Sequence, residues 1–361
     1  MIGATKKLAL ALRLQHTSFT SSAATATTNT TNNTRKTAVV VGATSGIGQA
    51  CARRLAESDE WTVIAVGRDR PGRAEQVIAD LELSSSSSTA ENDTTTASKK
   101  DTAPPASSRH EFRSCDAFSL GSVKECTENI LKDHTSIDAL IMTQGMATIQ
   151  GFTPTVDGND EKLSLHYWSR IAFASLLLPA LRSSSSNNSI IMPGGPVVLT
   201  VLSGGVHGAY KKYRKDPELK QSYSVPNAAD IAGFYSDLGF DFMARRSGND
   251  GINFIHASPG FVATNWGTEM PWFIKGPVRA LQKIGGMDAK DCAEIMLDPV
   301  FRSAAGEALI ARPNGEAEGI FIMNEKAQAS KLTPQHTADA RSFVWGVTVD
   351  VLRRAGIDIE K

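Results

Sequence analysis

The stretch VVVGATSGIGQA, residues 39–50, joins a run of β-branched residues to three glycines, Gly42, Gly46 and Gly48. Glycine loses more backbone entropy on folding than other residues, so such a cluster needs a structural reason. The apolar run predicts a buried strand, and the residues after the glycines have helical spacing. A turn between a strand and a helix N-terminus lets the backbone itself contact a negatively charged ligand. We therefore expect an anion-binding turn here.

The chain continues this alternation of strands and helices. The expected strands cover 37–43, 61–67, 110–116, 137–145, 195–205 and 252–260. The expected helices cover 46–59, 73–83, 119–133, 157–181 and 227–246, and a closing helix covers 337–352. Strands that alternate with helices indicate a parallel sheet covered on both faces. The predicted fold class is α/β, a doubly wound parallel sheet in a single domain, and ligands bind such sheets at the carboxyl ends of the strands.

Composition excludes several other classes of function. The 361 residues include 38 basic and 38 acidic side chains, and a neutral chain lacks the basic footprint of a nucleic-acid-binding protein. The four cysteines form no C-x-x-C pair, which argues against a metal site or a disulfide framework and for a reducing compartment. No apolar run approaches the roughly 20 residues that a transmembrane helix needs.

The predicted domain covers 36–361; one polar segment precedes it and a second is inserted within it. Residues 1–35 are basic, rich in hydroxyl side chains and free of acidic residues, as in a transit peptide of the mitochondrion or another organelle. The alternative is a disordered N-terminus on a cytoplasmic protein. Residues 84–108 consist mostly of polar residues, and we expect a disordered insertion because they cannot bury enough apolar surface to fold.

VVVGATSGIG resembles the cofactor motif of the short-chain dehydrogenase/reductase family, most closely its retinol-dehydrogenase-like branch. The similarity continues in register from about residue 37 to about residue 270. The resemblance implies a Rossmann-type sheet, a nicotinamide cofactor, and hydride transfer to or from a carbonyl or alcohol. It also implies that the first turn contacts the cofactor through Gly42, Thr44, Ser45, Gly46, Ile47 and Gly48.

Arg68 and Asp116 match further cofactor contacts of the family. Arg68 follows the second strand, where NAD-preferring members carry an acidic residue for the ribose hydroxyls. An arginine there can pair with a 2′-phosphate, so we predict NADP, with NAD as the alternative. Arg68 could also be a plain loop residue neutralised by Asp69. Asp116 resembles the residue that contacts the adenine amino group; its alternative role is an N-cap, although Ser119 could serve as that cap.

Two later turns also match the family's cofactor pocket. MTQG carries Thr143 where an asparagine is usual, and it retains Gly145. SPGFVAT resembles the family's Pro-Gly turn, with Val262 placed to contact the nicotinamide carboxamide. The contacts implied in this turn are those of Pro259, Gly260, Val262 and Thr264.

The catalytic residues depart from the family pattern, which uses an asparagine, a serine, a tyrosine and a lysine. Ser203 stands at the serine position. Tyr223 fits the first position of Y-x-x-x-K, but Asn227 replaces the lysine whose charge would lower the tyrosine pKa. His166 falls where a helix asparagine is usual, and a histidine can carry protons near neutral pH. Tyr210, Tyr213 and Tyr235 fit the tyrosine position less well.

Two hypotheses follow. The first is an NADP-preferring oxidoreductase that acts on a small, fairly apolar carbonyl or alcohol. The apolar residues of 265–286, which the family uses as a substrate lid, favour such a substrate or a peripheral contact with a membrane surface. The second is a catalytically impaired relative that binds NADP as a sensor or scaffold, because the lysine is missing. The oligomeric state has no signal in the sequence.

Overall fold

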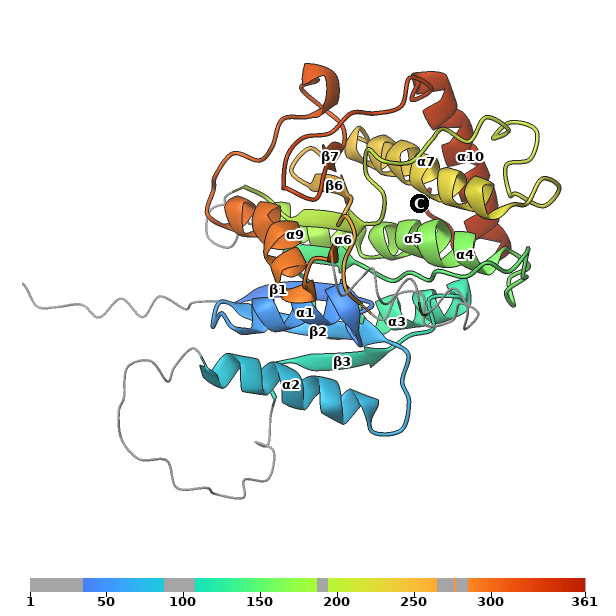
Figure 1. Cartoon of the computed structure of the whole chain (residues 1–361). Helices are drawn as coiled ribbons and strands as arrows, with labels where there is room; N and C mark the ends of the chain where they lie inside the picture. Colours follow the sequence, from blue (N-terminus) through green and yellow to red (C-terminus); the bar gives the residue numbers. More distant parts are fainter. Residues whose placement is uncertain (1–34, 88–107, 187–193, 265–275, 277–284, 361) are drawn as a thin grey trace, which may run out of the picture. The chain divides into compact units, whose positions relative to one another are not determined.

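The strands form one parallel sheet. The computed structural model describes residues 35–87, 108–186, 194–264, 276 and 285–360. In this part of the chain the sheet has seven strands in the order β3-β2-β1-β4-β5-β6-β7, and every neighbouring pair is parallel (Figure 1). The strands are β1 (Lys36–Val41), β2 (Trp61–Gly67), β3 (Glu111–Ser114), β4 (Ala139–Met142), β5 (Val197–Val201), β6 (Asn253–Ala257) and β7 (Phe321–Met323).

Helices cover both faces of this sheet, as predicted. They are α1 (Gly46–Ala56), α2 (Arg73–Ser87), α3 (Leu120–Asp133), α4 (Glu161–Leu163), the π-helical turn η2 (Ser164–Trp168), α5 (Ser169–Leu176), α6 (Leu178–Ser186), α7 (Val225–Ala244), α9 (Ala289–Ala304), the 3₁₀ turn η3 (Pro313–Gly315) and α10 (Ala338–Arg354). Apolar side chains of α1, α2 and α9 share one core with the sheet, and those of α3, α5, α7 and α10 share the other. The predicted α/β fold class is confirmed.

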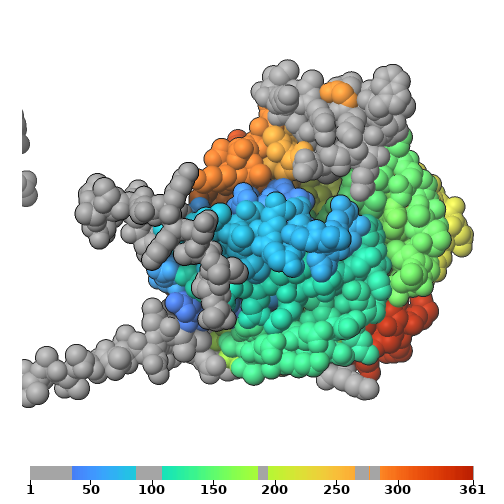
Figure 2. All heavy atoms as spheres, turned by 90° about the horizontal axis from the view of Figure 1, so that it is seen from below, coloured from blue at the N-terminus to red at the C-terminus, as the bar shows by residue number. Residues whose placement is uncertain are grey.

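The alternation of side chains along each strand explains why there are two cores. In β1, Val39 and Val41 belong to the core beneath α3, α5 and α7, whereas Ala38 and Val40 belong to the core beneath α1 and α9. Successive side chains of a strand point to opposite faces, so a strand that is apolar at every position must be covered on both sides. Seen from the α2 side, the surface is formed largely by the first half of the chain, coloured blue to green (Figure 2).

The strand order reverses beside β1, whose neighbours are β2 on one side and β4 on the other. The chain leaves β1 and β4 at adjacent points of the same edge, because Val41 pairs with Met142 at the ends of these strands. Such a reversal opens a crevice at the carboxyl ends of the strands. The fold therefore places the glycine turn after β1 and the turn after β4 side by side.

The structure corrects several predicted boundaries. The expected helix over 157–181 is wrong as a continuous element: Asp160 caps α4, a π-helical turn follows, and α5 ends before Pro179, which has no backbone N–H to donate. Helix α2 continues to Ser87, four residues into the segment expected to be disordered. Helix α9, which contains Pro299, and the short strand β7 were not predicted from the sequence.

Three predicted segments fall mainly or wholly outside the described residues. They are the transit peptide over 1–35, the insertion over 84–108 beyond Ser87, and most of the substrate lid over 265–286. The four cysteines are all described; each is buried and has a free thiol. Among the helices that the structure describes, none combines the length and apolarity that a membrane crossing requires.

Candidate active site

The glycine turn leads into a helix whose N-terminus is open. Gly42 and Gly46 have φ values of +87° and +58°, a region that residues with side chains rarely adopt. Gly48 is needed for another reason: a Cβ there would overlap the carbonyl of Gly42 and the hydroxyl of Thr143. These two constraints explain why this turn gives up side chains at three positions.

The N-terminus of α1 lacks the side-chain cap that α3, α4, α7, α9 and α10 have. Ser45 occupies the N-cap position in an extended conformation, but its side chain accepts no hydrogen bond from the helix, and the first turn contains no acidic residue. By contrast, Ser119, Ser224 and Thr337 each accept a backbone N–H at the start of α3, α7 and α10. The uncapped N–H groups of α1 and the positive end of its dipole favour an anion at this place.

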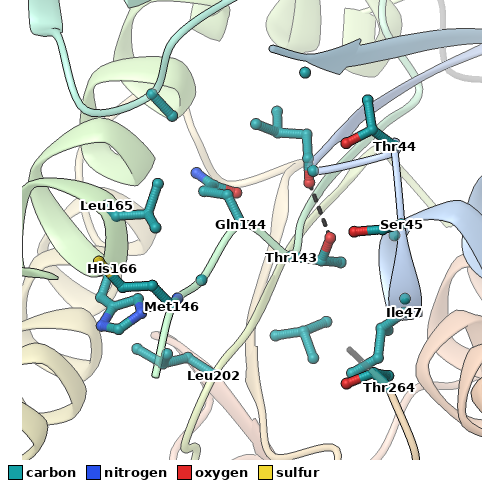
Figure 3. A pocket seen from close by; sticks show the side chains of 18 of the residues that line it. Thr44, Ser45, Ile47, Thr143, Gln144, Met146, Leu165, His166, Leu202 and Thr264 are labelled. Atoms are coloured by element: carbon teal, nitrogen blue, oxygen red, sulfur yellow. Dashed lines mark hydrogen bonds between the residues drawn. The ribbon is translucent and has the colours of Figure 1, made fainter. Parts of the chain in front are cut away.

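A cavity of about 580 Å³ lies against this turn. All the residues predicted to contact the cofactor line it: Gly42, Thr44, Ser45, Gly46, Ile47, Gly48, Arg68, Asp116, Thr143, Gly145, Pro259, Gly260, Val262 and Thr264. In Figure 3, Thr44, Ser45, Ile47 and Thr264 lie on one side of this cavity, and Leu165, His166 and Met146 lie on the other. An elongated ligand with an anionic middle fits this arrangement.

One end of the cavity carries Arg68 and Asp116. The exposed Arg68 guanidinium lies over the ring of Phe118, 5.6 Å from its centroid, and no carboxylate of the described residues, Asp69 included, pairs with it. Asp116 does not cap α3, because Ser119 does; one of its oxygens accepts the Phe118 N–H. Its second oxygen is thus available to a ligand.

Arg73 also supports this site, although it was not among the residues predicted from the sequence. Its guanidinium donates to the Thr44 carbonyl, at 2.7 Å, and to the Gln76 side chain, so it supports the glycine turn from the start of α2. The signal was the arginine one residue after Gly72, in the loop that Arg68 opens.

A hydrogen bond links the turn after β4 to the end of β1, next to the glycine turn. The Thr143 hydroxyl donates to the Val41 carbonyl at 3.0 Å, a bond that Figure 3 shows as a dashed line. Beyond Thr143 the chain passes Gln144 and Gly145 to Met146, whose N–H donates to Nε2 of His166 at 3.0 Å. Thr143 therefore ties two strands together at the cavity, where an asparagine was the usual residue.

His166 lies on the π-helical turn η2 and lines the other end of the cavity. Burial, together with the positive charges of Arg170 and Lys162, lowers the pKa of His166 to about 3, so the ring is neutral at physiological pH. Because Nε2 accepts a hydrogen bond, the single ring proton sits on Nδ1, which has no hydrogen-bond partner among the described residues. His166 can thus donate a hydrogen bond to a ligand. Insertions of this helical type occur frequently at functional sites.

The structure does not bring Tyr223 and Ser203 together. Neither residue lines the cavity, and no hydrogen bond joins them in the described part of the chain. The Tyr223 hydroxyl instead lies 3.0 Å from Nζ of Lys162 and 3.4 Å from the Gln150 carbonyl. Burial and the nearby carboxylates of Asp160 and Glu161 raise the pKa of Tyr223 to about 12.

Asn227, which replaces the expected lysine, belongs to the N-terminus of α7. Its side-chain amide donates to the Ser222 carbonyl at 2.7 Å, and its backbone N–H donates to the Ser224 hydroxyl. The ammonium group beside Tyr223 comes from Lys162 on α4, an element that the expected motif does not include. Sequence spacing could not reveal this pair, because 61 residues separate the two side chains.

Ser203 is held by two histidines and an aspartate. Its N–H donates to Nε2 of His256 at 3.1 Å, its carbonyl contacts Nδ1 of His207 at 2.9 Å, and its buried hydroxyl has no partner among the described residues. Asp237 lies between the histidines, 2.6 Å from Nδ1 of His256 and 3.0 Å from Nε2 of His207. A side chain at Gly233 would collide with His207 and the Ser203 hydroxyl. This cluster is therefore packed against α7.

The chain is similar in sequence to curated oxidoreductases. The chain is 29% identical over 230 residues to an oxidoreductase of Emericella nidulans, covering 63% of this chain and 59% of that protein. It is 25% identical over 278 residues to the short-chain dehydrogenase/reductase SAT2 of Stachybotrys chartarum, covering 72% and 70%. The chain thus spans about three fifths of the length of the first relative. No family model matches the chain.

A solved structure shares the fold of this chain. A short-chain dehydrogenase/reductase mutant from Serratia marcescens superposes with a TM-score of 0.52 at 16% identity, over 82% of this chain and all of that one. The strand order, the glycine turn at the reversal of that order, and the similarity to these proteins together support the resemblance of this chain to the short-chain dehydrogenase/reductase family.

Proposed function

We propose that this protein is an NADP-preferring oxidoreductase that transfers a hydride between the nicotinamide cofactor and a carbonyl or alcohol. The observation that carries the proposal is the uncapped N-terminus of α1, which lines the same cavity as Arg68 and His166. A pyrophosphate fits there, and Arg68 at one end fits a 2′-phosphate. Three glycines whose side chains would be strained or would overlap their neighbours permit the close approach of the ligand.

The cofactor supplies or takes up a hydride, that is, two electrons and a proton. In carbonyl reduction the hydride adds to the carbonyl carbon, and the carbonyl oxygen takes a second proton to give the alcohol. The protein must polarise that oxygen. Among the cavity residues at the end opposite Arg68, the His166 ring has a free N–H, and a neutral imidazole can polarise a carbonyl. We assign this role to His166, and solvent supplies the proton.

The lining around His166 favours an apolar substrate. Met146, Leu165 and Leu202 contribute side chains to this end of the cavity, and Phe261 is 39% exposed beside it. Apolar walls bind a ligand by removing its apolar surface from water. The retinol-dehydrogenase-like branch, a location in an organelle and a peripheral contact with a membrane surface stay predictions.

A second function has one observation in its favour. Tyr223 and Ser203 lie outside the lining of the cavity, and the residue of α7 that faces the Ser203 hydroxyl is Gly233. A protein that binds NADP without turnover, as a sensor or scaffold, would keep the glycine turn and lose this catalytic pair. The next experiment separates the two functions.

Binding and turnover can be measured independently. We expect NADPH to raise the melting temperature of the full chain, because a ligand that binds only the folded state stabilises it. We also expect NADPH consumption, followed at its absorbance, with at least one compound in a panel of apolar aldehydes and ketones. Stabilisation without consumption would support the sensor or scaffold, and the absence of stabilisation would overturn both functions.

The proposed contact of Arg68 with the 2′-phosphate can be tested by comparing the binding of NADPH and NADH. In Arg68→Gln, the Kd for NADPH should rise by about tenfold or more, because hydrogen bonds to charged groups contribute about 1.5–3 kcal/mol. The Kd for NADH should hardly change. Arg70→Gln is the matched control, since Arg70 is an exposed arginine of the same loop that does not line the cavity. Equal Kd values for NADPH and NADH in the unaltered protein would contradict the assignment.

His166 and Tyr223 are tested as a pair. His166→Leu should lower kcat for carbonyl reduction by about 100-fold, the usual effect of losing one donor to a developing oxyanion, and should leave the Kd for NADPH nearly unchanged. Tyr223→Phe should retain most of its activity. Because the pKa of His166 is about 3, kcat should show no histidine titration between about pH 5 and 8.

The opposite pattern of activities would assign the proton donor to Tyr223. If Tyr223→Phe abolishes turnover and His166→Leu does not, the proton donor is Tyr223 held by Lys162. Loss of activity in Lys162→Met would then be expected as well.

A further inference from the structure

Arg170, in α5, is a fully buried cation beneath the cavity. Its Nη1 donates to the carbonyls of Met142 and Val201 and to the Thr200 hydroxyl, at 3.1, 2.9 and 2.5 Å. Its Nη2 donates to the Gln144 carbonyl at 2.5 Å. The guanidinium thus spans the ends of β4 and β5, and neutral groups accept all of these hydrogen bonds.

No carboxylate of the described residues lies within ion-pair distance of Arg170. The buried Nε also has no hydrogen-bond partner in this part of the chain. Burial lowers the pKa of Arg170 to about 9, so the group remains charged at neutral pH. A buried charge is screened far less than one on the surface, and its field reaches its neighbours.

The surrounding ionisable groups do not cancel this charge. His166 is neutral, and burial together with the charges of His207 and Arg170 keeps the pKa of His256 low despite the contact with Asp237. Asp237 is matched by His207, because both ring nitrogens of His207 face oxygen acceptors: Nε2 lies 3.0 Å from the Asp237 carboxylate and Nδ1 lies 2.9 Å from the Ser203 carbonyl. Burial opposes a charge on His207, but the contact with Asp237 raises the pKa of His207. This cluster therefore leaves a net positive charge at Arg170.

Arg170 lies at the end of the cavity that the nicotinamide would occupy. Arg68 and Asp116 mark the adenine end, and the α1 N-terminus receives the pyrophosphate between the two ends. The groups that Arg170 holds, Gln144 and Val201, line the cavity next to Gly145 and Leu202. The oxidised nicotinamide ring carries one positive charge and the reduced ring carries none, whereas the rest of the dinucleotide is identical.

We propose that the uncompensated charge of Arg170 makes this site select the reduced dinucleotide and reject the oxidised one. The proposal rests on the proposed function and deepens it, because it gives the reaction a preferred direction. Reduced cofactor is held for attack on a carbonyl, and the oxidised cofactor formed by the reaction is repelled and leaves. The protein then works as a reductase.

Equilibrium binding tests this without turnover. By calorimetry on the full chain at neutral pH, the Kd of NADP⁺ should exceed that of NADPH by about tenfold or more, as expected for two like charges in a poorly screened site. Arg170→Gln removes the charge but keeps hydrogen-bond donors, and should bring the ratio of the two Kd values to within about threefold. Arg170→Lys keeps the charge and should largely preserve the ratio.

A second variant cancels the charge rather than removing it. Thr200→Asp places a carboxylate where the Thr200 hydroxyl now accepts from Arg170, and it should lower the ratio as Arg170→Gln does. If Arg170→Gln does not fold, Thr200→Asp alone tests the role of the Arg170 charge. Arg246→Met is the control for lost charge, since Arg246 follows the C-terminus of α7 and donates to the Ile359 carbonyl. A 2′-phosphate analogue of ADP-ribose, which lacks nicotinamide, should bind the unaltered protein and Thr200→Asp equally.

The outcomes separate this inference from the proposed function. Equal Kd values for NADPH and NADP⁺ in the unaltered protein overturn the selection by redox state and leave the function intact. A high ratio that persists in Thr200→Asp overturns the role of Arg170. Failure to bind either dinucleotide overturns the proposed function itself.

Discussion

The free N–H groups at the start of α1 are the constraint on which the site depends. A helix N-terminus has unpaired donors, and at the start of α3, α4, α7, α9 and α10 a serine, threonine or aspartate side chain accepts hydrogen bonds from them. At α1 that partner is missing, and the glycines on either side remove the side chains that could shield the donors from a ligand. The reversal of strand order beside β1 then opens the space in front of them. The cavity, the Thr143 bridge to Val41 and the position of Arg68 all follow from this placement.

The catalytic end is built differently from the family pattern. Lys162 and Arg170 place positive charges near it, and neither residue belongs to the segment that carries the expected lysine position at 227. These two residues flank His166 in sequence, and burial together with their charges lowers the pKa of His166. The chemistry proposed here therefore relies on a neutral histidine as hydrogen-bond donor and on a fixed positive charge. A tyrosine ionised with the help of a lysine is not part of it.

The sequence was sufficient to predict the sheet and the cofactor end of the site. Apolar strands such as 37–43 and the spacing of the three glycines reflect local constraints, which a single segment can reveal. The catalytic end could not be predicted in this way. Tyr223 contacts Lys162, which lies 61 positions earlier in the chain, and Gly233 faces His207. These contacts arise only when α4, α7 and the loop after β5 pack together. The break in the helix at Pro179 was visible in the sequence, whereas the π-helical turn at His166 was not.

A crystal structure of the full chain with NADPH would test the central claim most directly. We expect pyrophosphate oxygens within about 2.7–3.2 Å of the Ile47 and Gly48 N–H groups, with the adenine between Arg68 and Asp116 and the nicotinamide toward His166. NADPH density at another surface, or an empty cavity in crystals saturated with NADPH, would contradict it.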